Sequence, residues 1–231
     1  MNVLSIETAT QVASAALLRE KHLLGEFFLN IKKNHSEKLL PMIHQLLQDA
    51  EMPSKEIDLV AVSIGPGSFT GLRIGMATAK GLSYGWGVPL IGVGTLDAMA
   101  FSQRTYPKAV VPLINARRQE AYGAIFLEGV RKTDYFVWPV AVLLDKLKEM
   151  GQLAPLFLGD GAQVLSIELQ EALPEARFVG AGSIDNRAGH VGFLALEEYA
   201  QRKEDSLADL APFYVRDSQA EQNLKRKMNH E

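Results

Sequence analysis

One order of secondary-structure elements, β-β-β-α-β-α, is predicted twice along this chain, and the repetition constrains the fold more than any single motif. Short apolar runs separated by a few polar residues indicate strands, whereas apolar residues at spacings of three and four indicate a helix. The first copy contains predicted strands at 3–6, 12–18 and 23–29, a helix at 36–50, a strand at 57–64 and a helix at 69–84, and a strand at 88–93 and a helix at 95–103 follow it.

The second copy begins after Pro107, which breaks the pattern before it. It contains predicted strands at 109–115, 121–127 and 131–137, a helix at 140–150, a strand at 155–158 and a helix at 162–173, followed by a strand near Phe178 and a last helix at 186–202. A three-stranded meander followed by alternating helices and strands is typical of a mixed sheet with helices on both faces. We therefore predict an α/β protein with two lobes, at residues 1–104 and 105–216, and a polar, disordered tail at 217–231.

This duplicated order resembles the actin-like, sugar-kinase and heat-shock ATPase fold (ASKHA, ribonuclease H-like), in which a nucleotide lies in the cleft between two lobes. In such a fold the first hairpin turn of each lobe faces the nucleotide phosphates. The candidate cleft residues are Glu7 and Thr8 in the first lobe, Asn115 and Arg118 in the second, and Asp160 in a turn at the adenosine side. Asn115 is neutral and cannot act as a general base, and the Asp160 segment is equally explained as a turn without a ligand.

Composition limits the classes of function. The chain has 24 basic and 27 acidic residues, a formal net charge of −3, which argues against free-standing, sequence-independent binding to nucleic acid. It has no cysteine, which excludes disulfides, a thiol nucleophile and a Cys-ligated metal. No apolar run approaches the roughly 20 residues that cross a bilayer, and the start, MNVLSIETAT, does not read as a signal peptide. We therefore expect a cytoplasmic protein that does not bind a membrane.

A glycine-rich turn at residues 65–71 connects a buried strand to a helix. The free N–H groups at a helix N-terminus can bind a phosphate, but the spacing matches neither a P-loop nor a dinucleotide fingerprint. A tight strand-to-helix turn without a ligand is the alternative. Ser68 in this turn lacks the Gly-x-Ser-x-Gly context of a nucleophile, and the spacing of the five histidines predicts no metal site.

The helix predicted at 69–84 carries Gly71, Gly75 and Ala79 at four-residue spacing. Glycine within a helix costs up to about 1 kcal/mol relative to alanine, so close approach of another element must compensate. This face is therefore a packing surface, either inside the lobe or between subunits.

Capping residues predict where three of the helices begin or end. Ser36 and Thr95 are suited to N-cap positions, because a side-chain oxygen there accepts a hydrogen bond from a free backbone N–H. Gly85 and Gly87 are expected to end the helix that begins near Phe69.

Five segments together resemble one family over nearly the whole chain. They are residues 6–10 (IETAT), 35–41 (HSEKLLP), 63–75 (SIGPGSFTGLRIG), 115–122 (NARRQEAY) and 212–216 (PFYVR). The chain is similar to the TsaB (YeaZ) family, and the third segment is the most specific part of the match. The resemblance implies a non-catalytic scaffold or activator subunit that works with a paralogue, TsaD, and a small ATPase, TsaE. Together these proteins form threonylcarbamoyladenosine next to the tRNA anticodon.

The resemblance also implies roles for particular residues. The catalytic paralogue carries a His-x-x-x-His metal pair, and Thr95 and Met99 stand at those positions here, so no metal and no intrinsic cofactor are expected. The first two helices of the family form the surface for self-association and for the paralogue. The candidates for that surface, of which some must belong to the internal core, are Leu39, Met42, Ile43, Leu46, Arg73, Met76, Ala77 and Lys80.

Further expectations about partners and nucleotides follow from the same resemblance. The homodimer and the heterodimer with TsaD would compete for one patch, tRNA would bind only through the complex, and ATP or ADP would bind at the cleft or at the TsaD junction. Glu7 stands where the family often has Asp, and Asn115 replaces an Asp; both departures argue against autonomous ATP hydrolysis. The alternative function is nevertheless an ATPase or phosphotransferase that uses the cleft. A peptidase has neither thiol, metal ligands nor a serine triad to support it.

Overall fold

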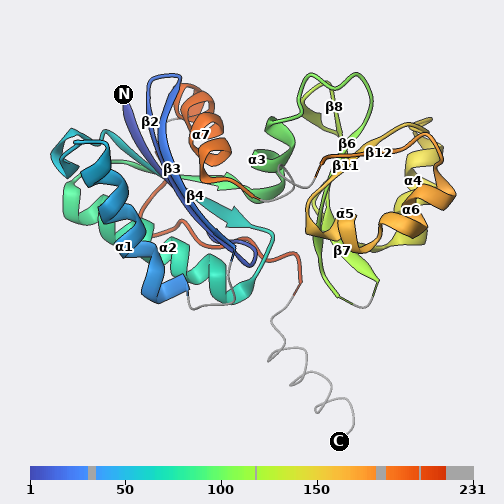
Figure 1. Ribbon diagram of the computed structural model, residues 1–231, viewed down its shortest axis with the longest axis horizontal. Coiled ribbons are helices and arrows are strands. Elements are labelled where there is room, and N and C mark those ends of the chain that lie inside the picture. Colours follow the sequence, from blue (N-terminus) through green and yellow to red (C-terminus); the bar gives the residue numbers. More distant parts are fainter. Residues whose placement is uncertain (31–34, 118, 181–185, 203, 217–231) are drawn as a thin grey trace, which may run out of the picture.

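The computed structural model describes residues 1–30, 35–117, 119–180, 186–202 and 204–216 and shows two lobes side by side, each built on its own sheet (Figure 1). The first sheet has five strands in the order β3-β2-β1-β4-β5. These strands are β1 (Asn2–Glu7), β2 (Val12–Arg19), β3 (His22–Asn30), β4 (Leu59–Gly65) and β5 (Leu90–Gly94). The first three form the predicted antiparallel meander, and β4 and β5 run parallel to β1.

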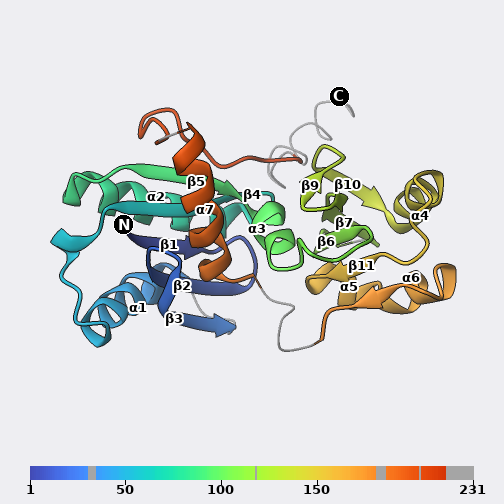
Figure 2. The same ribbon diagram turned by 90° about the horizontal axis from the view of Figure 1, so that it is seen from above.

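Helices cover both faces of the first sheet. The helices α1 (His35–Asp49) and α2 (Phe69–Trp86) lie on one face, and α3 (Thr95–Phe101) and α7 (Ala188–Arg202) lie on the other (Figures 1 and 2). A short 3-10 turn, η1 (Ser54–Glu56), precedes β4. One apolar layer packs under α1 and α2, and a second packs under α7. Two covered faces explain why β4 is apolar along almost its whole length.

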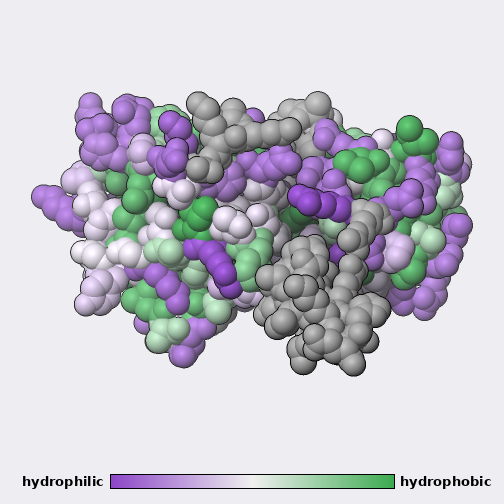
Figure 3. Space-filling view, turned by 90° about the horizontal axis from the view of Figure 1, so that it is seen from below, coloured by the Kyte–Doolittle hydropathy of each residue, from purple (hydrophilic) through white to green (hydrophobic). Residues whose placement is uncertain are grey.

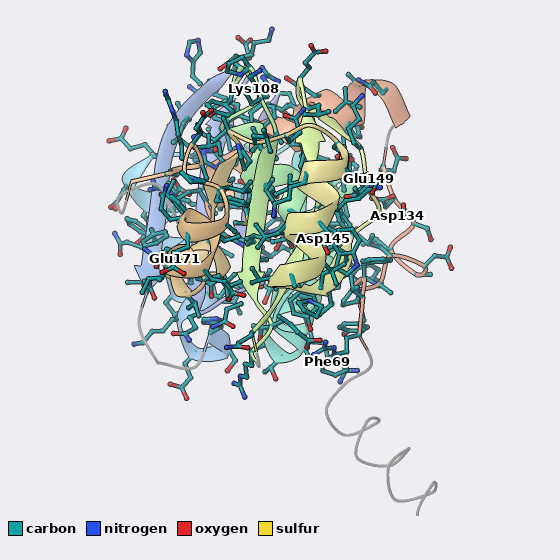
Figure 4. The ribbon with its side chains drawn as sticks, turned by 90° about the vertical axis from the view of Figure 1, so that its right-hand side faces the viewer. Phe69, Lys108, Asp134, Asp145, Glu149 and Glu171 are labelled. Carbon is teal, nitrogen blue, oxygen red and sulfur yellow. The ribbon has the colours of Figure 1, made fainter. Side chains whose placement is uncertain are left out.

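The second sheet has the strand order β10-β7-β6-β11-β12, and two short strands, β8 and β9, extend it from β6. Its strands are β6 (Val110–Asn115), β7 (Glu120–Gly123), β8 (Phe126–Leu127), β9 (Val130–Arg131), β10 (Phe136–Pro139), β11 (Leu156–Leu158) and β12 (Arg177–Phe178). Its helices are α4 (Val140–Glu149), α5 (Asp160–Val164) and α6 (Ser166–Ala172). Figure 4 looks onto this lobe, where Asp145 and Glu149 mark α4 and Glu171 marks α6.

Three elements predicted in the second lobe as continuous are divided in the structure. The strand predicted at 121–127 becomes β7 and β8, which both pair with β6 but have different second partners, β10 for β7 and β9 for β8. The strand predicted at 131–137 likewise becomes β9 and β10. The helix predicted at 162–173 begins earlier, at Asp160, and is divided into α5 and α6 at Leu165, whose φ and ψ of −98° and 7° depart from helical values.

Two predicted helix caps are wrong and one helix end is confirmed. Ser36 lies inside α1, which begins at His35, and Thr95 is the first residue of α3, whose N-cap is Gly94. The Thr95 hydroxyl instead accepts a hydrogen bond from the N–H of Gly65 at 3.1 Å. α2 continues through Gly85 and ends at Gly87, which adopts a left-handed conformation with φ of 67°.

The chain returns to the first lobe after the second sheet. The prediction assigned all of residues 105–216 to the second lobe, but α7 packs against β1, β2, β4 and β5 of the first sheet. The hydroxyl of Ser5 donates to the carbonyl of Ala188 at 2.7 Å, and the N–H of Ala188 donates to the hydroxyl of Ser14 at 3.2 Å. The apolar pattern of α7 predicts a helix but contains no information about which sheet receives it. The predicted tail, 217–231, lies outside the described residues.

Candidate functional site

A cavity of about 600 Å³ lies between the two lobes. The turn after β1 and the glycine-rich turn before α2 form its walls on the first lobe, and the turn after β6 and the start of α5 form its wall on the second. Residues 213–216 line it as well. The residues of its lining are Ala9, Thr10, Gln11, Pro66, Gly67, Ser68, Phe69, Thr70, Ile114, Asn115, Ala116, Arg117, Tyr122, Asp160, Phe213, Tyr214, Val215 and Arg216.

Only part of the predicted cleft set reaches this cavity. Asn115 and Asp160 line it, and the backbone N–H of Asn115 donates to the Asp160 carboxylate at 3.1 Å. Glu7 and Thr8 are buried and absent from the lining, with 1% and 0% of their surfaces exposed. Arg118 lies outside the described residues. The first lobe therefore presents a turn of small residues to the cavity in place of a carboxylate.

The glycine-rich turn is required by close packing within the first lobe. A Cβ atom added to Gly67 would overlap the carbonyl oxygen of Ala9, and one added to Gly71 would overlap that of Thr8. Gly75 lies equally close to the Thr8 hydroxyl, which donates to the carbonyl of Gly71 at 2.9 Å. Of the two alternatives for this helix face, the structure shows internal packing. Ser68 is the N-cap of α2 and accepts from the N–H of Gly71 at 3.2 Å.

Glu7 is a buried acid without a cationic partner among the described residues. Burial raises its pKa from 4.5 to about 7, and the hydrogen bond from the N–H of Ala9 offsets only part of this effect. The Ala9 N–H lies 2.5 Å from the Glu7 carboxylate. Because Glu7 does not line the cavity, its carboxyl group cannot act on a molecule bound there.

The positions expected to replace the paralogue's metal ligands are structural. Thr95 is fully buried, and its hydroxyl accepts from Gly65. Met99 is 4% exposed and packs in the apolar cluster between α3 and the second sheet. In the part of the chain that the structure describes, no three His, Cys, Asp or Glu side chains gather closely enough to hold a metal ion.

The predicted subunit surface divides into a buried and an exposed set. Five of its eight residues belong to the interior of the first lobe, with 7% or less of their surfaces exposed: Leu39, Met42, Ile43, Leu46 and Met76. Arg73 and Ala77 are exposed, and Lys80 is half-buried. The members that belong to the core are thus the apolar stripe of α1, which packs on the sheet, together with Met76. Leu40 and Tyr84, which are not in the predicted set, are 51% and 82% exposed.

The outer face of α2 is therefore defined by Arg73, Ala77, Lys80 and Tyr84, four residues on one side of the helix. We call this set the α2 outer face. Figure 3 views the molecule from the side on which α1 and α2 lie and shows apolar and polar residues interspersed over the first lobe. The face is neither a continuous apolar patch nor uniformly charged.

Residues 205–216 form a strap that connects the two lobes. Its start is fixed to β5, where the N–H of Asp205 donates to the carbonyl of Leu90 at 2.8 Å, and its middle is fixed to β4, where the N–H of Phe213 donates to the carbonyl of Ile64 at 2.7 Å. Its end reaches the second lobe, where Arg216 pairs with Glu120 at 2.6 Å. Sequence reasoning recognised the Pro-Phe-Tyr-Val-Arg segment but not this role.

A second contact between the lobes involves Asp97 at the start of α3. Arg131 of β9 pairs with the Asp97 carboxylate at 3.2 Å, and the hydroxyl of Tyr135 donates to it. Burial raises the pKa of Asp97 to about 6, and the charge of Arg131 opposes this increase. Together with the strap, this contact fixes the walls of the cavity relative to each other.

The architecture defines the class of protein first. The fold has two lobes, each with a mixed sheet covered by helices, and a cavity lies between them. A fold of this kind belongs to the actin-like ASKHA class. In agreement, a ROK hexokinase from Thermus thermophilus aligns with a TM-score of 0.51 at 12% identity, covering 87% of this chain and 99% of that chain. At that identity the likeness concerns the fold alone.

Closer relatives then define the family. A family model described as "TsaD: tRNA N6-adenosine threonylcarbamoyltransferase" matches residues 22–224. The tRNA threonylcarbamoyladenosine biosynthesis protein TsaB of Bacillus subtilis (strain 168) is 31% identical over 228 residues, 96% of each chain. The structure of YeaZ from Pseudomonas aeruginosa aligns with a TM-score of 0.74 and 26% identity over 92% of this chain and 99% of that one. The chain belongs to the TsaB (YeaZ) family.

Proposed function

We propose that this chain is a non-catalytic subunit in the formation of threonylcarbamoyladenosine in tRNA. Its partners would be a TsaD-type threonylcarbamoyltransferase, which performs the transfer, and the ATPase TsaE. The name of the Bacillus subtilis relative supports the pathway, and the match to a TsaD family model supports descent from a common ancestor with the transferase.

One observation carries the non-catalytic part of the proposal. A hydroxyl and a thioether, those of Thr95 and Met99, stand where the resemblance places the metal-binding imidazoles of the paralogue. Both side chains are buried and engaged in the packing between α3 and its neighbours. Neither is a ligand that competes well for the metals that imidazole binds.

The accessory role is tested by reconstitution. Unmodified tRNA, the threonylcarbamoyl adenylate, the TsaD-type subunit and TsaE are combined with and without this chain, and modified adenosine is quantified by mass spectrometry. We expect little product without the chain and none from the chain alone. Full activity in its absence would refute the proposal.

A second candidate function rests on the cavity between the lobes. Its volume of about 600 Å³ is within the range of small-molecule sites, and Asp160, Arg117 and Tyr122 offer polar groups from the second lobe. The chain would then bind ATP or ADP, either alone or together with the TsaD-type partner. Turnover of ATP by the isolated chain that Asp160→Ala abolishes would favour an ATPase or phosphotransferase; binding without turnover would favour a site that has lost its chemistry.

The remaining partner assignments belong to the same proposal. We infer that the isolated chain forms a homodimer through the surface that receives the TsaD-type partner, that the complex and not this chain alone binds tRNA, and that the protein works in the cytoplasm. The net charge of −3 supports indirect contact with tRNA, since direct contact needs a basic surface. Within the described residues, no helix is both long and apolar enough to span a bilayer.

A further inference from the structure

Four arginines in the described part of the chain lie over aromatic rings, and three of them also pair with a carboxylate. Arg104 lies over Phe101 and pairs with Glu197, Arg131 lies over Tyr135 and pairs with Asp97, and Arg187 lies over Phe28 and pairs with Glu26. The fourth is Arg73 on the α2 outer face. Within the described residues it has no carboxylate partner, although two rings and a hydroxyl group contact it.

Two aromatic rings and a hydroxyl group hold Arg73 in place. Its guanidinium carbon lies 3.8 Å from the centre of the Phe69 ring and 6.0 Å from that of Tyr214. The rings of Phe69 and Tyr214 stack on each other at 4.4 Å, and the Nε of Arg73 donates to the Tyr214 hydroxyl at 3.2 Å. We call the arrangement of Phe69 and Tyr214 around Arg73 the clamp. Phe69 begins α2, whereas Tyr214 belongs to the strap, so the clamp joins two segments far apart in the sequence. Figure 4 shows Phe69 at the lower edge of the molecule.

A clamp of this kind orders the guanidinium before a partner arrives. An exposed arginine loses side-chain entropy when it forms an ion pair, and holding its planar fork in advance reduces that loss. The Nη groups are the remaining donors of Arg73, and a carboxylate accepts two parallel hydrogen bonds from such a fork. The clamp therefore suits a carboxylate that arrives from outside the chain.

The charge of the surrounding surface indicates which partner supplies that carboxylate. α2 contains no Asp or Glu, and its two charged side chains, Arg73 and Lys80, lie on the same side seven residues apart. Ala77 lies between them and Gly81 follows Lys80. An added Cβ on Gly81 would meet no atom within 4 Å, so internal packing does not require that glycine. A second copy that laid its α2 on this one would oppose like charges, which is unfavourable.

We propose that Arg73, held by Phe69 and Tyr214, is the receptor for a carboxylate on a partner of different sequence whose docking face is acidic. The inference rests on the proposed function, in which that partner is the TsaD-type subunit. The inference adds that the group recognised on the partner is a carboxylate. It also assigns to Tyr214 of the strap the role of positioning Arg73. It also predicts that the mixed complex is favoured by charge over the homodimer on the same surface.

The experiment measures dissociation constants of the complex with the TsaD-type subunit at low and high salt. We expect Arg73→Gln to weaken the complex about tenfold or more at low salt and to flatten its salt dependence, because an ion pair is lost. Arg73→Lys should not restore full affinity, since an ammonium group lacks the planar fork. Tyr214→Phe keeps the ring and removes only the hydroxyl, and should weaken binding less than Arg73→Gln.

Arg104→Gln is the matched control. Arg104 is also stacked and exposed but is already paired with Glu197, so this substitution should change the dissociation constant by less than about twofold. Self-association of Arg73→Gln, measured by ultracentrifugation, should be unchanged or stronger, because a like charge is removed.

Three results would overturn the inference. If Arg73→Gln binds the partner like the wild type while Ala77→Glu does not, the proposed function stands and the carboxylate receptor is wrong. If Arg73→Gln weakens self-association as much as the mixed complex, the carboxylate belongs to a second copy. If the wild-type chain does not bind the TsaD-type subunit at all, both the inference and the proposed function fail.

Discussion

Replacing Glu7 by Gln should make the stability of this protein much less sensitive to pH. The carboxyl group of Glu7 is 1% exposed, and burial raises its pKa from 4.5 to about 7 in the folded state. The folded protein therefore binds a proton at Glu7 more tightly than the unfolded chain does. The stability contributed by this proton is fully present below pH 4.5 and is lost progressively as the pH rises to about 7.

The magnitude follows from the interval between the two pKa values. From 4.5 to about 7, at about 1.4 kcal/mol for each pKa unit, the loss in the free energy of unfolding is of the order of 3 kcal/mol. Glutamine has nearly the same shape, can still accept from the Ala9 N–H and never ionises. Glu7→Gln should thus resemble the wild type at low pH and exceed its stability by up to about 3 kcal/mol at pH 8.

Urea denaturation of both proteins at pH 5 and pH 8 provides the assay. The difference between them isolates Glu7, because other titrating groups, such as Asp97 with its pKa of about 6, are common to both. Parallel dependence of the two proteins on pH would refute the reasoning, since it would mean that Glu7 does not remain buried and unpaired.

Two matched pairs of substitutions test burial and close approach, and one single substitution tests the α2 outer face. Leu39→Ala should lower the free energy of unfolding by about 2–5 kcal/mol, whereas Leu40→Ala should change it by less than about 1 kcal/mol. The reason is that Leu39 is 1% exposed and Leu40 is 51% exposed. Equal losses of stability in urea denaturation would contradict the assignment of the α1 faces. Gly71→Ala should lower the free energy of unfolding by about 1–3 kcal/mol or more, because the added Cβ atom would overlap the Thr8 carbonyl oxygen. Gly81→Ala should raise thermal stability slightly, because a Cβ atom there meets no other atom within 4 Å. Ala77→Glu should leave the unfolding curve unchanged but abolish association in ultracentrifugation, and normal assembly would show that the α2 outer face is not the interface.

Local patterns in the sequence predict much of the first lobe. The spacing of Leu39, Ile43 and Leu46 indicates the helix that the structure shows as α1, and the runs near Val3, Val12 and Leu23 correspond to the meander β1 to β3. These elements are predictable because each has one periodic apolar pattern and a short connection to the next.

The second lobe and the site depend on contacts that local patterns do not contain. β7 and β8 are separate because they pair with different strands, β10 and β9. An apolar layer and hydrogen bonds with Ser5 and Ser14 hold α7 on the first sheet. The apolar stripe of α1 identifies a face that is buried but not what covers it, so a core was predicted as an interface. The sheet covers it, so Arg73, Ala77 and Lys80 of the α2 outer face are the members of the candidate set that lie outside the core.

The clamp around Arg73 shows the same limit at a functional position. Arg73 and Tyr214 are 141 residues apart in the chain and meet because the strap follows β5 and β4 to the start of α2. The motifs that contain them, Gly-Leu-Arg and Phe-Tyr-Val-Arg, are visible in the sequence, and their contact is not. Likewise, Glu7 is recognisable as a carboxylate at the end of a strand, but its distance from the cavity depends on the packing of the β1–β2 turn against the glycine-rich turn.

The central claim is that this chain contributes a docking surface and no reacting group. It is tested most directly by measuring threonylcarbamoyladenosine formation in the reconstituted system with two variants, Asp160→Asn in the cleft and Ala77→Glu on the α2 outer face. We predict that the cleft variant supports modification at the wild-type rate and that the surface variant does not. Loss of activity with Asp160→Asn, together with full activity for Ala77→Glu, would contradict the account.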